Sequence, residues 1–123
     1  MSDGGASAGG AHGQEGGTGT GRLDSRPAGP LAGIRVLDLA TMLAGPYGAT
    51  LLGDLGADVI KVESHYGDES RHLGPERDGE RSPFLSLNRN KRGVVLDLRR
   101  PPAREIFGRL AGTSDILITK VRE

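Results

Sequence analysis

The sequence contains no cysteine and no tryptophan. The lack of cysteine excludes disulfide bonds, thiolate metal sites and cysteine nucleophiles, and it fits a protein of the reducing cytoplasm. The chain also has no net charge, because its 16 basic and 16 acidic side chains cancel. Only four aromatic residues could stack on bases: Tyr47, Tyr66, Phe84 and Phe107. Since nucleic-acid affinity needs a broad basic surface, both features argue against a nucleic-acid-binding protein.

Long apolar runs are missing as well. No run reaches the roughly 18 residues that a membrane span needs. The N-terminus is rich in Gly, Ala, Ser and Thr and lacks the apolar core of a secretory signal. We therefore expect a soluble, cytoplasmic protein with no membrane or nucleic-acid partner.

Large apolar residues are almost absent from residues 1–30, where Leu23 is the only one apart from Met1. This segment also holds 10 of the 21 glycines. It cannot bury enough surface to offset the entropy lost on ordering, so we predict a disordered tail over residues 1–30. The stretch "GGTGTGR" (residues 16–22) resembles a phosphate-binding loop, but no strand precedes it as such a loop requires.

Four short apolar runs beyond the tail are typical of β-strands. They are residues 34–40 ("IRVLDLA"), 57–63 ("ADVIKVE"), 93–98 ("GVVLDL") and 115–119 ("DILIT"). Strands that alternate with helices pair in parallel, so the pattern predicts an α/β fold, a Rossmann-like open parallel sheet with flanking helices. We expect residues 31–123 to form a single domain that is incomplete, because so few elements make a small core.

Two segments between these strands have helical periodicity. Pro46 suits a first helical turn, and Tyr47, Leu51 and Leu55 recur at a spacing of four before Gly56, a typical helix stop. The second helix has one apolar stripe, formed by Ala103, Ile106, Phe107 and Leu110. Both helices are therefore expected to be amphipathic.

Ligands of open parallel sheets bind beyond the carboxyl ends of the strands. Arg99 and Arg100 follow the third predicted strand, and residues 41–46 follow the first. These two segments are candidates for an anion site. Gly45 could bring the backbone close to a ligand, although an ordinary strand-to-helix turn is the better interpretation.

Residues 64–83 are polar and are predicted to form a long loop. Four of them could bind a metal or exchange protons: His65, Asp68, Glu69 and His72. Because their spacing is not diagnostic, we interpret them as solvated loop residues. Lys91 and Arg92 are likewise interpreted as part of a solvated surface.

Four blocks of the sequence follow one another in an order shared with a known family. They are "PLAGIRVLDLATMLAGPYGATLLGDLGADVIKVE", a Gly-Asp loop, "NRNKRGVVLDLRRP" and "SDILI". Together they cover about residues 30–119 and resemble the N-terminal part of the family III CoA-transferases. The resemblance implies an α/β enzyme whose two subunits interlock as a homodimer.

The resemblance also implies a reaction, the movement of CoA between carboxylic acids. An acyl-CoA and a carboxylic acid would be the substrates, with no tightly bound cofactor. In this family an aspartate attacks the thioester to form a mixed anhydride. That aspartate belongs to a segment beyond the blocks quoted above, so we expect this chain alone to be inactive.

Candidate CoA contacts follow from the same resemblance. The loop after the first strand approaches the thioester end of CoA in this family, which corresponds here to Met42, Leu43 and Ala44. In the "LDLR" segment Leu96 would lie near the adenine and Arg99 would contact a phosphate. Arginine suits that role because its planar fork can grip phosphate.

Several positions depart from the family pattern. Leu43 stands where transferases often have glutamine, Ser64 stands where some members have an arginine, and Lys120 and Val121 replace an Asn-Phe pair. Lys91 and Arg92 belong to a family signature that we interpret as structural.

Two alternatives stay open beside the transferase. One is an acyl-CoA racemase of the same family, and the other is a non-catalytic module that binds CoA or a nucleotide. The long segment 64–83 favours the transferase, because the racemases tend to shorten it.

Overall fold

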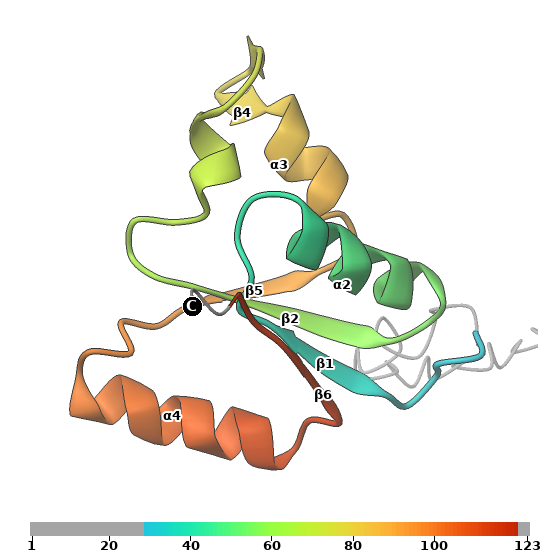
Figure 1. Ribbon diagram of the computed structural model, residues 1–123, viewed down its shortest axis with the longest axis vertical. Coiled ribbons are helices and arrows are strands. Elements are labelled where there is room, and N and C mark those ends of the chain that lie inside the picture. The colour runs from blue at the N-terminus through green and yellow to red at the C-terminus, as the bar shows by residue number, and fades with distance from the viewer. Residues whose placement is uncertain (1–28, 121–123) are drawn as a thin grey trace, which may run out of the picture.

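The computed structural model describes residues 29–120, so most of the predicted tail and Val121 lie outside the described residues. Four parallel strands form the central sheet (Figure 1). In spatial order they are β5 (Arg92–Val95), β2 (Asp58–Glu63), β1 (Arg35–Asp38) and β6 (Ile116–Ile118). The predicted α/β fold with an open parallel sheet is confirmed.

The order in which the strands are added to the sheet changes direction at β1. The first three strands run outward from β1 through β2 to β5, and β6 then returns to the other side of β1. Leu37 in β1 pairs with Ile60 on one side and with Leu117 on the other. The boundary between β1 and β6 is therefore the topological switch point, beyond whose carboxyl ends such folds bind ligands.

Two helices cover opposite faces of the sheet. Helix α2 (Ala44–Asp54) lies over one face and α4 (Pro101–Gly112) over the other (Figure 1). The adjacent residues Val36 and Leu37 are both 0% exposed, and they belong to the two different cores. Because side chains alternate along a strand, β1 needs apolar residues on both sides, which explains why Val36 and Leu37 are consecutive apolar residues.

The helix predicted after the first strand is present, but its large apolar residues face outward. Tyr47, Leu51 and Leu55 are between 42% and 50% exposed. The buried residues of α2 are compact: Pro46, Ala49, Thr50 and Gly53. A methyl group on Gly53 would lie 3.3 Å from Val59 Cγ2, because the helix packs closely on the sheet. The spacing of four therefore identified the helix but not its buried face.

Helix α2 ends at the predicted position. Leu55 caps it, and Gly56 follows with a φ of 104°, a left-handed conformation that favours glycine. Gly29 packs against Gly56, and the Leu31 N–H donates to the Leu55 carbonyl at 3.0 Å. The start of the described chain is thus tied to the end of α2.

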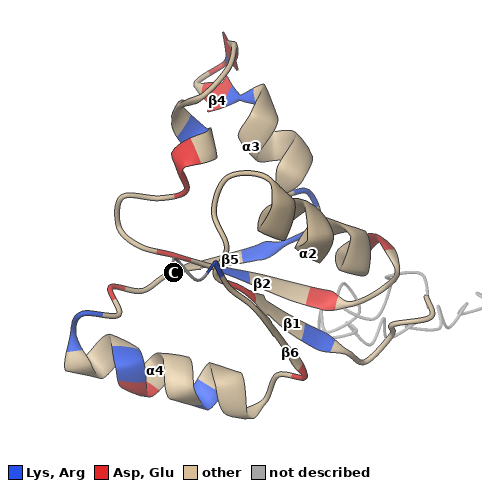
Figure 2. Cartoon of the chain, viewed as in Figure 1, with Lys and Arg blue, Asp and Glu red and all other residues tan. Residues whose placement is uncertain are grey.

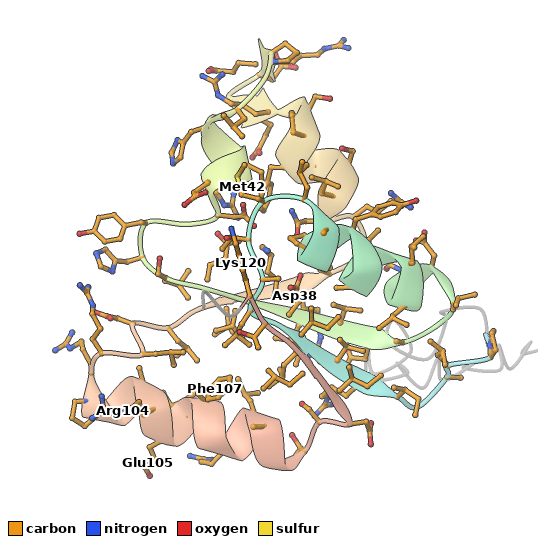
Figure 3. The ribbon with its side chains drawn as sticks, viewed as in Figure 1. Asp38, Met42, Arg104, Glu105, Phe107 and Lys120 are labelled. Carbon is orange, nitrogen blue, oxygen red and sulfur yellow. The ribbon has the colours of Figure 1, made fainter. Side chains whose placement is uncertain are left out.

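Most of the predicted stripe of α4 packs on the sheet. Ala103, Phe107 and Leu110 contact the core on the α4 side of the sheet, whereas Ile106 is 45% exposed. Phe107 points toward the strands (Figure 3). The Arg100 side chain makes no capping hydrogen bond at the start of this helix. Within residues 29–120, neither α4 nor another helix is long and apolar enough to cross a bilayer.

Residues 64–83 are more ordered than the predicted long loop. They contain a 3₁₀ helix, η1 (Glu69–His72), and two short antiparallel strands, β3 (Glu76–Arg77) and β4 (Glu80–Arg81). Helix α3 (Ser82–Leu87) follows, and together these elements form a lobe that projects from the sheet (Figure 1). The prediction of one long loop over residues 64–83 was therefore wrong.

Candidate functional site

Two hollows open at the carboxyl edge of the sheet. The larger, of about 540 Å³, lies beyond β1, β2 and β5, and Leu96, Leu98 and Val62 give it an apolar floor. The smaller, of about 350 Å³, lies at the switch point between β1 and β6. Ala40 and Thr41 line both, so the two hollows adjoin one another.

The residues predicted to contact CoA divide between these hollows. Leu96 and Arg99 line the larger one, and the loop residues Met42, Leu43 and Ala44 line the smaller one. These residues come from two segments more than fifty positions apart in the sequence. The parallel sheet brings them to one edge because β1 and β5 end on the same side.

Arg99 is already paired with a carboxylate at the mouth of the larger hollow. Its Nε lies 2.8 Å from Asp97 Oδ1, and its NH2 lies 3.1 Å from Asp97 Oδ2. Hydrogen bonding to Arg99 lowers the pKa of Asp97 to about 2. The Arg99 side chain is 71% exposed, so an anion in the hollow can reach its outer nitrogens.

Lys120 is the charged residue that lines the smaller hollow, together with Thr119. It follows β6 and lies close to the Met42 loop (Figure 3). Lys120 therefore places a cation on that side of the switch point.

Gly45 lines the smaller hollow and also packs closely against the end of its own strand. A Cβ atom at Gly45 would collide with the Cβ of Ala40 and would also lie 3.6 Å from Ile118 Cγ2. Glycine at this position is needed for the turn to pack against its own strand. The interpretation of Gly45 as part of an ordinary strand-to-helix turn fits this geometry.

Charged side chains are buried beneath the loop that follows β1, and charges occur within the central strands themselves (Figure 2). Lys91 Nζ lies 2.8 Å from Asp38 Oδ2, and Lys61 Nζ lies 2.9 Å from Asp68 Oδ2 and 3.7 Å from Asp38 Oδ2. No side chain of the four is more than 3% exposed. We refer to Asp38, Lys61, Asp68 and Lys91 as the buried charge cluster.

The buried charge cluster corrects two interpretations made from the sequence. Asp68 is not a solvated loop residue, and Lys91 is not part of a solvated surface. Lys91 also donates to the carbonyls of Pro46 and Leu87 and to Asn88 Oδ1. Two cations balance two anions, which is how buried charges are tolerated in a protein interior.

A signal for this cluster is present in the sequence. Asp38 and Lys61 interrupt the apolar runs "IRVLDLA" and "DVIKVE". Strands of a parallel sheet are covered on both faces, so a charge inside such a run must be buried and must have a partner. The identity of that partner depends on the fold, because Lys91 is 53 positions away from Asp38.

Burial and pairing act in opposite directions on the titration of this cluster. Burial opposes ionisation of Asp68, but hydrogen bonds from Lys61, Ser70 and the Met42 amide outweigh it and lower the pKa below its ordinary value. Burial lowers the pKa of Lys91, and the hydrogen bond to Asp38 offsets only part of that effect. Asp68 is therefore a carboxylate at neutral pH.

The carboxylates at this edge are all engaged with cations. Asp38 and Asp68 are buried against lysines, and Asp97 is held by Arg99. Within residues 29–120, no group of three or more His, Asp or Glu side chains could hold a metal ion. His65 instead stacks on Tyr66 with their ring centroids 4.0 Å apart. The geometry thus suits the binding of an anionic, partly apolar ligand.

Comparison with known proteins shows which protein family the chain matches. The model of CoA-transferase family III matches residues 31–123. The chain is 48% identical over 95 residues to the succinyl-CoA–L-malate CoA-transferase beta subunit of Chloroflexus aurantiacus, and 42% identical over 103 residues to the succinyl-CoA:glutarate CoA-transferase of Homo sapiens. These matches cover 76% and 82% of this chain and 24% of each relative.

Solved structures agree with the sequence comparison. A CAIB/BAIF family protein from Brucella suis has 42% identity and a TM-score of 0.70, over 75% of this chain and 26% of that one. The protein Rv3272 from Mycobacterium tuberculosis has 41% identity and a TM-score of 0.67, over 75% of this chain and 25% of that one. The chain spans about a quarter of the length of the relatives it matches. By sequence and by fold, this chain belongs to CoA-transferase family III.

Proposed function

We propose that this chain supplies part of the CoA-binding α/β domain of an enzyme that moves CoA between carboxylic acids. One observation carries the proposal. The five residues with expected CoA contacts line two adjoining hollows at the carboxyl edge of the sheet, in a chain of this family. The relatives from Chloroflexus aurantiacus and Homo sapiens are CoA-transferases, which favours CoA transfer over the racemase alternative.

A CoA molecule would extend across both hollows. Its adenine would lie on the apolar floor near Leu96, with a phosphate at Arg99. Its thioester end would pass Ala40 and Thr41 and reach Met42, Leu43 and Ala44. An elongated ligand with an anionic end and an apolar middle matches the sequence of side chains along this path.

The transfer step requires a nucleophilic carboxylate from outside this chain. That carboxylate attacks the thioester carbonyl, a mixed anhydride forms, and CoA leaves as the thiolate. Asp38, Asp68 and Asp97 do not fit this role, because each is held by a cation. The proposal includes an acyl-CoA and a carboxylic acid as substrates, an interlocked homodimer, no tightly bound cofactor and a cytoplasmic location.

Calorimetric titration of the 123-residue protein with CoA tests this proposal. We expect saturable binding of CoA and weaker binding of CoA that lacks its 3′-phosphate, because one charge-assisted contact is lost. Failure to bind CoA at concentrations up to about 1 mM would contradict the proposal, since specific cofactor sites exceed that affinity.

An assay of acyl exchange tests the assignment of the nucleophile. With a panel of acyl-CoAs and free carboxylates, we expect the 123-residue protein to show no exchange, because binding without an attacking group does not lower the barrier. Turnover above about 1 s⁻¹, the low end for typical enzymes, would show that the chain carries its own nucleophile.

A further inference from the structure

The loop between β1 and α2 is tied to the buried charge cluster by its backbone. The Ala40 N–H donates to Asp38 Oδ1 at 3.0 Å, and the Ala40 carbonyl accepts from Lys61 Nζ at 3.0 Å. The Met42 N–H donates to Asp68 Oδ1 at 3.1 Å. Three backbone groups of a short loop are thus bound to three buried ionised side chains.

Met42 has a backbone conformation that it would not adopt alone. Its φ is 71°, in the left-handed region that residues with a side chain rarely occupy. Such a conformation persists only where surrounding contacts enforce it. The hydrogen bond from the Met42 N–H to Asp68 is a contact of this kind, because Asp68 comes from a different loop of the chain.

Asp68 is itself held rigidly. Its Oδ1 also accepts from the Ser70 N–H at 2.9 Å and from Ser70 Oγ at 2.8 Å, and its own N–H donates to Glu63 Oε2 at 3.0 Å. Its Oδ2 lies 2.9 Å from Lys61 Nζ. The carboxylate therefore cannot turn away from Met42 without breaking several charge-assisted hydrogen bonds.

Met42 also lines the smaller hollow, beside Leu43 and Ala44. The left-handed turn at Met42 decides which peptide groups of this loop face the hollow. We propose that Asp68, held by Lys61, is a positioning residue that keeps Met42 in its left-handed conformation and so shapes the loop for the thioester end of CoA. This inference rests on the proposed function, and no atom of Asp68 is required to touch the ligand.

The chain offers a direct probe of this contact. It has two methionines, Met1 and Met42. Met1 has no peptide N–H, so protein labelled with ¹⁵N-methionine gives one backbone amide signal, that of Met42. We expect this amide to exchange slowly with solvent in the wild-type protein, because it is hydrogen-bonded to a buried carboxylate.

Substitution of Asp68 tests the positioning role. Asp68→Ala should speed exchange of the Met42 amide at least about tenfold, the change that loss of one charge-assisted hydrogen bond produces. Asp68→Asn keeps an oxygen acceptor and should show a smaller increase, and it decides the question if Asp68→Ala does not fold. Asp54→Ala is the matched control, because Asp54 pairs with Arg89 in an exposed position.

Ligand binding separates positioning from a general loss of structure. Asp68→Ala should weaken binding of CoA about tenfold and binding of adenosine 3′,5′-bisphosphate by clearly less, because that nucleotide lacks the thioester arm, although Asp68 also lines the larger hollow. An equal loss for both ligands would overturn the inference, as would a Met42 amide that exchanges as in the wild type. If the wild-type protein binds neither ligand, the proposed function fails, and the Met42 amide alone then decides whether Asp68 holds the loop.

Discussion

Arg99 is the exposed cation of the larger hollow, and Asp97 occupies one side of its guanidinium. We expect Arg99→Ala to weaken CoA binding about fivefold, since an exposed charge-assisted contact is screened by water. Calorimetry with CoA and with CoA lacking the 3′-phosphate measures this change. Arg109→Ala, at an exposed position of α4, is the control. Equal affinities of wild type and Arg99→Ala for both ligands would remove Arg99 from the site.

Lys91 stabilises the protein by neutralising a buried carboxylate. Lys91→Met should lower the free energy of unfolding by about 3 kcal/mol, because Asp38 would keep only the more distant Lys61 as a cationic partner. Urea unfolding measures this loss.

The double variant Asp38→Asn with Lys91→Met is the complement of that experiment. It should cost less than the sum of the two single substitutions, since no uncompensated charge then remains. Strict additivity would show that the two side chains do not interact.

The elements of the sheet follow largely from local patterns. β1, β2 and β6 lie within their apolar runs, β5 overlaps the third run but starts one residue earlier at Arg92, and Gly56 marks the end of α2 as predicted. The lobe formed by η1, β3, β4 and α3 was missed, although Asp78 and Gly79 carry a signal. Both have positive φ, as a two-residue β-hairpin requires, and Asp-Gly is a preferred pair for that turn.

The orientation of α2 could not be predicted in the same way. The spacing places Tyr47, Leu51 and Leu55 on one side of α2. It does not show that the sheet packs against the other side of the helix, which carries the smaller residues. That choice depends on how closely the helix packs against residues distant in sequence, such as Val59. Close packing favours alanine and glycine over leucine at the contact.

This orientation makes a prediction for α2. Ala49→Leu should lower the free energy of unfolding by about 1–3 kcal/mol, because the added atoms must fit between helix and sheet. Leu51→Ala should change it by less than about 0.5 kcal/mol, as is usual for an exposed position. Urea unfolding of both variants tests the orientation, and the reverse order of effects would contradict it.

At the scale of the whole molecule, the chain has no net charge but contains many ion pairs between its own side chains. Pairing lowers the pKa of Glu63, Asp58 and Asp68 below their ordinary values of 4.5 for Glu and 3.8 for Asp, despite burial, and lowers that of Asp97 to about 2. A carboxyl group with a lowered pKa binds fewer protons in the folded state than in the unfolded state. Its stabilising effect is complete above the unfolded pKa and is lost as the pH falls through the folded pKa.

We therefore expect the free energy of unfolding to be level just above pH 4.5 and to fall between about pH 4.5 and 2. Urea titrations at several pH values measure this slope. Asp68→Asn should make the slope shallower, because it removes one of the responsible groups. A slope that is unchanged in Asp68→Asn would mean that Asp68 titrates alike in the folded and unfolded protein.

The position of the candidate site at the carboxyl edge of the sheet is a prediction that the sequence allows, whereas the contacts that hold its loops in place could not be predicted. Arg99 could be placed because it follows an apolar run, and ligands of parallel sheets bind at that edge. The partners of Lys61 and the strained backbone of Met42 depend on contacts between separate loops. Such contacts have no local signature, so only the folded chain reveals what holds the Met42 loop in place.

Mapping of CoA by NMR tests the central claim most directly. On titration of uniformly ¹⁵N-labelled protein with CoA, we expect amide shifts in residues 40–45 and 96–99, which line the two hollows. Amides at the opposite edge of the sheet, such as Arg35, Asp58 and Asp115, should not shift. Shifts confined to that opposite edge, or spread evenly over the protein, would contradict a CoA site at the carboxyl ends of the strands.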